Sequence, residues 1–208
     1  SGRIREAIRD LITAAARDRT NMMFSLLHMK SAGYFKPPSE ETPESLALEL
    51  FMTDGMDAAI PPFEVLAHAS GAPEYQAFLC FCYILANRGT DAVLISEWFA
   101  DSKEPDFCLI RAIAFRSVGC LHDAEGITRD VLTNYPDSRP ALNMYVRTLL
   151  EQDRYRDAYF ELSSRKDALS SDCTLLEAFI SCLIRSGEYR DAALTAVRIM
   201  QMNPGRPM

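Results

Sequence analysis

The side chains that could bind a metal ion are too few, and too poorly spaced, to form a metal site. The sequence contains three histidines, His28, His68 and His122, and none shares a predicted helix face with an acidic or cysteine partner at ligand spacing. Cys80 and Cys82 lie two positions apart, so on a helix their side chains diverge. Cys120 and His122 span a predicted turn, and with Cys108 they would supply three ligands where a structural zinc ion takes about four. We therefore expect no metal.

Sequence motifs of catalysis are absent as well. The chain has no glycine-rich phosphate loop, no Gly-x-Ser-x-Gly nucleophile turn and no His-Glu-x-x-His metalloprotease motif. Aspartate and glutamate are plentiful, but on predicted helices they are typical of solvated surfaces. We expect a protein that is not an enzyme and needs no cofactor.

Composition and charge favour a folded protein that does not bind nucleic acid. Of the 208 residues, 48% are hydrophobic and 25% are charged, and the formal net charge is −7. Binding to nucleic acid requires a basic face that displaces counterions from the phosphates. Residues 1–36 are an exception to the acidic balance, because they carry seven basic side chains against three acidic ones. No apolar run approaches the roughly 18 residues that cross a membrane, so we expect no membrane insertion.

The placement of the cysteines indicates the redox state of the cellular compartment. All six, at positions 80, 82, 108, 120, 173 and 182, fall in apolar stretches of predicted helix. That placement is typical of reduced, buried thiols, and we therefore expect a cytoplasmic protein. The chain begins with Ser1 and not with methionine, and we expect it to be a piece of a longer protein.

A 34-residue interval organises the second half of the chain. The sequence Tyr-Arg-Asp-Ala occurs at 155–158 and again at 189–192. One interval before the first copy, Ala124 occupies the alanine position, and Pro136 precedes Pro204 by two intervals. Several positions in one register indicate structural units that repeat and stack on one another.

Each unit is predicted to be a pair of helices joined by a tight turn. Apolar residues recur at helical spacing before and after each turn. The turns fall at Gly119, Asp153 and Gly187, which are 34 residues apart. Glycine adopts a left-handed backbone most easily, and aspartate tolerates it. The units therefore predict an all-α fold.

This pattern resembles the tetratricopeptide repeat (TPR) family over about residues 105–204. The matching residues in three successive units are Ala112, Phe115, Gly119, Ala124 and Pro136; Leu149, Tyr155 and Ala158; and Leu183, Gly187, Tyr189, Ala192 and Pro204. The second unit departs from the family, because Ser170 stands where the closing proline belongs, and we expect its second helix to end early. The resemblance implies a right-handed α-solenoid of stacked antiparallel helix pairs.

The rest of the chain is expected to add helices of the same kind. We divide it into an N-terminal amphipathic helix pair (1–35), a linker-like loop (36–43), degenerate helical pairs (44–104) and three TPR-like repeats (105–208). The first helix is predicted from Ile4, Ile8, Leu11 and Ile12, which follow helical spacing. Further upstream of the repeats we expect a helix over 42–51, a helix that starts at Pro61 and Pro62, and a turn at Gly89.

The resemblance also implies where a partner binds. In a TPR stack the first helix of each unit lines a concave groove that holds a peptide or helix of another protein. The groove positions are, unit by unit, Leu109, Ile110, Ile113, Arg116 and Ser117; Asn143, Met144, Arg147 and Glu151; and Glu177, Ala178, Ser181 and Arg185. The three arginines favour an acidic peptide, and Leu109, Ile113 and Met144 favour an apolar anchor. As an alternative, the arginines pair with Glu151 and Glu177 within the chain.

The C-terminal helix is expected to carry apolar residues outside its packed stripe, namely Ala193, Val197, Met200 and Met202. A terminal helix of a repeat array normally has a polar outer face, so we expect another element to pack there: more of the same chain, a second copy, or a partner protein. Together these features favour a scaffold or adaptor within an intracellular protein complex. Two alternatives remain open: a regulatory TPR segment of a larger enzyme, and a helical-repeat protein that binds RNA.

Overall fold

The computed structural model describes residues 2–16, 56–165 and 172–202, and the single positions 43, 47, 50 and 169. Over these residues it contains ten α-helices and one short 3-10 helix, with no strand. The predicted all-α fold is confirmed for this part of the chain. The helices expected over 21–35 and 42–51, and the linker over 36–43, fall outside the continuous described ranges.

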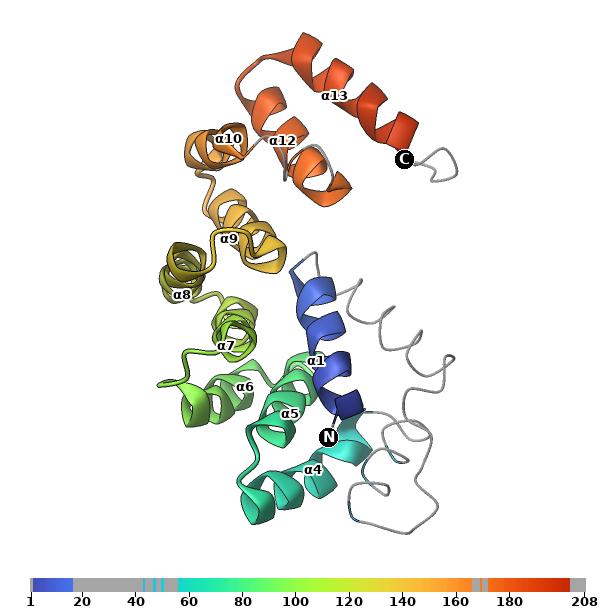
Figure 1. The fold of residues 1–208 in the computed structure, drawn as a ribbon, viewed down its shortest axis with the longest axis vertical. Coiled ribbons are helices and arrows are strands. Elements are labelled where there is room, and N and C mark those ends of the chain that lie inside the picture. The colour runs from blue at the N-terminus through green and yellow to red at the C-terminus, as the bar shows by residue number, and fades with distance from the viewer. Residues whose placement is uncertain are drawn as a thin grey trace.

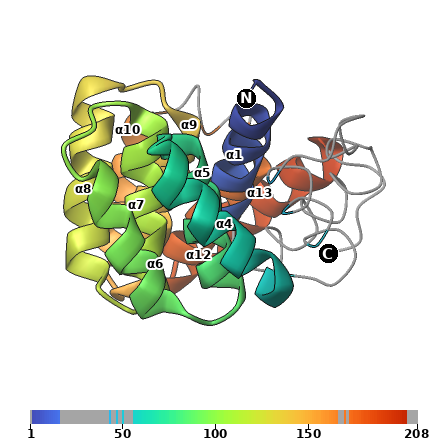
Figure 2. The ribbon, with the colours of Figure 1, turned by 90° about the horizontal axis from the view of Figure 1, so that it is seen from below.

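Helices that follow one another along the chain pack against one another (Figure 1). In order they are α4 (Met56–Ser70), α5 (Pro73–Leu85), α6 (Gly89–Ser96), η1 (Glu97–Phe99), α7 (Pro105–Ser117), α8 (Leu121–Asn134), α9 (Arg139–Glu151), α10 (Tyr155–Ser164), α12 (Cys173–Arg185) and α13 (Tyr189–Met202). The first helix, α1 (Gly2–Ala15), departs from this order, because it packs on α5 and α7. It lies on the side of those helices that faces away from α6 and α8 (Figures 1 and 2).

Proline and aspartate determine where several helices begin. Helices α5, α7 and α9 each have proline in the first turn, where its missing N–H costs no hydrogen bond. At α12, the Asp172 carboxylate accepts hydrogen bonds from the backbone N–H groups of Thr174 (2.8 Å) and Leu175 (3.4 Å). Asp172 thus satisfies two of the four N–H groups that a helix start leaves unpaired.

The turns within the predicted repeats have the left-handed backbone that the 34-residue pattern implies. The φ angles are 79° at Gly119, 58° at Asp153 and 79° at Gly187. In each turn the next residue's N–H donates to a carbonyl five residues earlier, over 3.0 Å from Cys120 to Phe115 and 2.9 Å in the other two turns. Such a bond closes the end of a helix whose last carbonyls would otherwise lack donors.

The turn between α5 and α6 falls at Asn87, so the prediction of Gly89 is wrong. Asn87 has φ 62°, and the N–H of Arg88 donates to the carbonyl of Tyr83 over 2.8 Å. Gly89 is instead the first residue of α6, and a Cβ there would lie 2.7 Å from Cγ1 of Val118. A glycine stands at this position because the end of α7 approaches it closely, and the left-handed turn uses asparagine.

The prediction that a helix starts at Pro61 is also wrong. Helix α4 begins at Met56 and contains both prolines. Ala59 and Ile60 are buried, at 0% and 3% exposure. Packing of these side chains therefore holds a helical turn before the prolines, which sequence preference alone would not favour.

The second helix of the middle repeat does end early, as expected. Helix α10 has 10 residues, whereas α8 and α13 have 14 each. Where the two helices of a repeat cross, the predicted alanines are buried: Ala124 and Ala158 at 0% exposure and Ala192 at 5%. A methyl group at these points lets the helix backbones approach closely.

Candidate functional site

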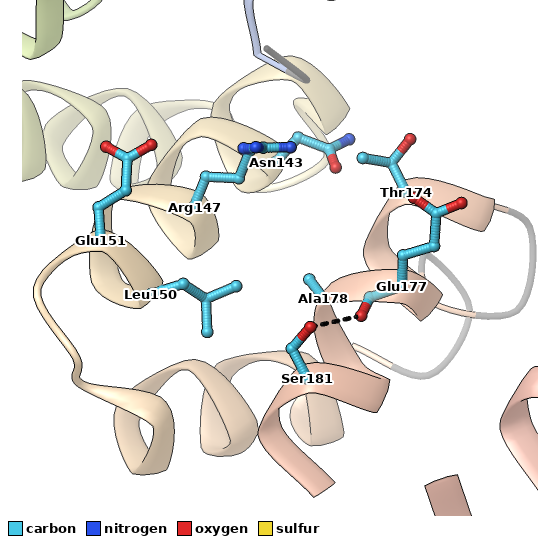
Figure 3. Close-up of a pocket in the computed structure, with 8 residues that line it drawn as sticks. All are labelled: Asn143, Arg147, Leu150, Glu151, Thr174, Glu177, Ala178 and Ser181. Atoms are coloured by element: carbon cyan, nitrogen blue, oxygen red, sulfur yellow. Dashed lines mark hydrogen bonds between the residues drawn. The ribbon is translucent and has the colours of Figure 1, made fainter. Parts of the chain in front are cut away.

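An open pocket of about 340 Å³ lies between α9 and α12 (Figure 3). The residues that line it come from facing sides of the two helices: Asn143, Arg147, Leu150 and Glu151 from α9, and Thr174, Glu177, Ala178 and Ser181 from α12. These helices are the first helices of two consecutive predicted repeats. The pocket therefore lies where the sequence pattern predicts a groove.

The structure brings together most of the groove residues predicted for these two helices. Asn143, Arg147, Glu151, Glu177, Ala178 and Ser181 all line the pocket. Sequence reasoning missed Leu150 and Thr174. Leu150 adjoins Glu151, and Thr174 lies in the first turn of α12, one turn before Ala178. Helical spacing was the signal that would have found Thr174.

Hydrogen bonds fix the walls of the pocket. The side-chain amide of Asn143 donates to the Asp172 carboxylate over 3.0 Å, which joins α9 to the capping residue of α12. The hydroxyl of Ser181 donates to the backbone carbonyl of Glu177 over 3.1 Å (Figure 3).

Arg116 and Arg185, which are expected in the groove, contact other side chains of the protein. Arg116 of α7 forms an ion pair with Glu151 of α9 over 3.1 Å, and donates to the backbone carbonyl of Ala15 over 3.5 Å. The guanidinium of Arg185 lies over the ring of Tyr155, 4.9 Å from its centre, in cation–π geometry. Arg147 lines the pocket. The alternative in which arginine pairs with Glu151 thus holds for Arg116.

The predicted apolar anchor is wrong, because its residues belong to the core. Leu109, Ile113 and Met144 are 2%, 6% and 0% exposed and pack in the continuous hydrophobic core. Helix α1 covers α7 on this side. A repeat pattern assigns these positions to an open groove, but it carries no information about a helix from outside the repeats.

The C-terminal helix has an exposed apolar face. Val197 and Met200 are 49% and 52% exposed, as expected, and so is Leu194 at 61%, which sequence reasoning did not single out. Ala193 is also exposed, and the side chain of Met202 lies outside the described residues. Ala192 and Ile199 form the opposite, buried face that packs on α12.

The cysteines are free thiols in varied surroundings. Cys80, Cys82 and Cys182 are buried as predicted, and burial raises the pKa of Cys182 to about 11, which disfavours its nucleophilic thiolate. Cys120 is exposed, so the expectation of burial is wrong there. It is the residue before α8, where the chain leaves the left-handed turn at Gly119.

The described residues also bear on metal sites and membrane spans. No group of three or more histidine, cysteine, aspartate or glutamate side chains in that part of the chain is placed to hold a metal ion. Likewise, none of the helices in the described ranges has both the length and the apolar character to cross a membrane.

Comparisons with known proteins add no relative. No protein-family model matches the chain, and no curated protein matches it. The repeat pattern and the geometry of the site are therefore the features that point to a function.

Proposed function

We propose that this chain is a non-enzymatic scaffold or adaptor of the TPR type, a right-handed α-solenoid that binds a peptide or helix of another protein in its concave groove. The observation that carries the proposal is the pocket between α9 and α12. It lies between equivalent helices of consecutive repeats, and six of its eight lining residues are groove positions of the family pattern. The sequential packing of the helices and the repeated left-handed turns support the same assignment.

The lining of the pocket suits a polypeptide ligand. Asn143, Thr174 and Ser181 offer polar groups to a peptide backbone, and Leu150 and Ala178 offer apolar contact. Its charged residues have both signs, since Arg147 stands with Glu151 and Glu177. We therefore propose a partner segment with polar and apolar side chains in alternation, and do not retain the preference for an acidic peptide. A cytoplasmic location, in a complex with other proteins, fits the free thiols.

Selection from a displayed library of random peptides, followed by fluorescence polarisation with the enriched peptides, tests this proposal. Ser181→Trp places a large ring in the pocket from an exposed position of α12 and should weaken binding at least about tenfold. Ser186→Trp is the matched control, because Ser186 is exposed at the end of the same helix and does not line the pocket.

Failure to enrich any peptide would contradict the proposed function. Equal affinities of wild type and Ser181→Trp would place the interface elsewhere on the chain.

A further inference from the structure

Helix α1 occupies the side of α7 on which the sequence pattern predicts an open groove, and it also packs on α5. One face of α1 is buried there, and its members are Ala7, Ile8, Leu11, Ile12 and Ala15, none more than 5% exposed. The opposite face, with Glu6, Asp10 and Thr13, is exposed. A helix in the middle of the core is buried all round, as α5 is, with ten of its 13 residues buried. Helix α1 thus packs in the manner of an amphipathic helix laid into a groove.

Two arginines of α1 form ion pairs with residues remote in the sequence. Arg5 pairs with Glu74 in the first turn of α5 over 2.6 Å, and Arg9 pairs with Asp106 in the first turn of α7 over 3.0 Å. Glu104, the residue before α7, adds a further carboxylate to this edge. Because these ion pairs are exposed, they contribute little to the stability of the packed helix. They favour one orientation of the helix and basic side chains on this flank.

The far end of α1 is linked to the α9–α12 pocket. Arg116 donates to the carbonyl of Ala15 at the last residue of α1 and also pairs with Glu151, which lines the pocket. One arginine therefore connects the surface under α1, which we call the α1 seat (the faces of α5 and α7 that α1 covers), with the open part of the groove.

We infer that α1 is a displaceable, built-in occupant of the concave groove, and that the partner which replaces it is a basic amphipathic helix with the same apolar spacing. This inference rests on the proposed function in assigning the concave face to partner binding. The buried face of α1 and residues of α5 and α7 belong to one hydrophobic cluster, and Glu74, Glu104 and Asp106 lie at one edge of the α1 seat. The seat therefore selects small and branched apolar side chains with arginine or lysine on one flank. Because α1 belongs to the same chain, it competes intramolecularly and keeps the seat closed to weak ligands.

The test uses the full chain and a fluorescent peptide of residues 2–16 as the partner helix. In wild type, the chain's own α1 competes with the peptide and binding should be weak. Leu11→Glu puts a charge on the buried face of α1 and should release it, so that the variant binds the wild-type peptide at least about tenfold more tightly. Thr13→Glu is the matched control, since it adds the same charge on the exposed face and should bind like wild type.

Charge selection has its own measurement. A peptide with Arg5→Glu and Arg9→Glu should bind Leu11→Glu several-fold more weakly than the wild-type peptide at low salt, and the difference should shrink as salt is raised. Equal binding of the two peptides would overturn the basic character assigned to the partner.

Hydrogen exchange of the wild-type chain tests the inference without the Leu11→Glu variant, and this test is needed if that variant does not fold. The amides of α1 should exchange through a local opening, faster than those of α5 and α7. Exchange of all three helices at one common rate would make α1 a permanent part of the core and overturn the inference. A wild-type dimer that Leu11→Glu abolishes would also overturn it, by making α1 of a second copy the occupant. None of these readouts involves the α9–α12 pocket, so they fail or succeed separately from the proposed function.

Discussion

Two glycines in neighbouring segments should respond to the same substitution with opposite sign. Gly119 has φ 79° in the turn before α8, a conformation that costs an alanine about 1 to 2 kcal/mol. Gly126 lies inside α8, and a Cβ there would meet nothing within 4 Å. Alanine in a helix interior is about 0.5 to 1 kcal/mol better than glycine. We expect Gly119→Ala to lower the urea midpoint of unfolding and Gly126→Ala to raise it.

The comparison contains its own control, because both variants add one methyl group to the same helical hairpin. Gly187 has the same φ of 79° and open surroundings in the last repeat, so Gly187→Ala should behave as Gly119→Ala does. A Gly119→Ala variant as stable as wild type would mean that the turn can abandon its left-handed residue.

A buried carboxylate makes stability depend on pH. The side chain of Glu125 is 5% exposed and forms ion pairs with Arg129 of its own helix and with Arg154 in the turn between α9 and α10, the latter over 2.7 Å. Burial by itself raises the pKa of Glu125, but side-chain hydrogen bonds, first that of Arg154, and the charges of both arginines outweigh it and hold the pKa below its usual 4.5. A carboxyl group with a lowered pKa stabilises the fold above its unfolded pKa, and this contribution is lost as pH falls through the folded value.

We therefore expect Glu125→Gln to cost about 1 to 2 kcal/mol at pH 7, since both arginines can still reach water. The difference in the free energy of unfolding between wild type and Glu125→Gln should become smaller as the pH falls from 5 to 3. Urea unfolding at each pH measures this difference. Asp123→Asn, an exposed acidic residue of the same helix, is the control and should leave stability nearly unchanged. A gap that stays constant down to pH 3 would contradict the role assigned to the arginines.

At the scale of elements, one side chain both starts α12 and fixes it to α9. Asp172 accepts hydrogen bonds from two N–H groups of α12 and from the side-chain amide of Asn143. Asp172→Ala should cost about 1 to 2 kcal/mol and speed hydrogen exchange in the first turn of α12, where Thr174 lines the pocket. Asp172→Asn keeps an acceptor for the N–H groups and should therefore lose less stability than Asp172→Ala. Identical exchange in wild type and Asp172→Ala would show that the cap is not what orders this turn.

The helices and turns that the sequence predicted well are those where local chemistry decides the structure. Gly119, Asp153 and Gly187 sit at turns whose backbone few residues tolerate, so they recur in register and are easy to recognise. The turn was wrongly predicted at Gly89. A glycine stands there because Val118 approaches it closely, and not because the backbone turns at that residue. The helix start was wrongly predicted at Pro61, because burial of Ala59 and Ile60 outweighs the local preference of proline.

At the scale of the whole molecule, the candidate site was predictable only where the predicted repeats form it. Spacing located most of the pocket between α9 and α12, since both walls belong to the repeat register. Spacing could not place α1 over α5 and α7, because that contact joins segments about 70 to 100 positions apart with no shared pattern. For the same reason Leu109 and Ile113 were expected in an open groove and lie in the core.

An array in which helices contact mainly their neighbours should be least stable where a helix has neighbours on one side only. Among the residues that the structure describes, α13 packs on α12, with Ala192 and Ile199 buried, whereas α5 contacts α1, α4, α6 and α7. We expect the amides of α13 to exchange at least about a hundredfold faster than those of α5 in the wild-type chain. Ile199→Ala should speed exchange in α13 further and leave α5 unchanged, because the lost contacts reach no farther than α12. Equal exchange of α5 and α13, or an Ile199→Ala effect that spreads to α5, would mean that the helices unfold as one cooperative unit and not as a chain of neighbours.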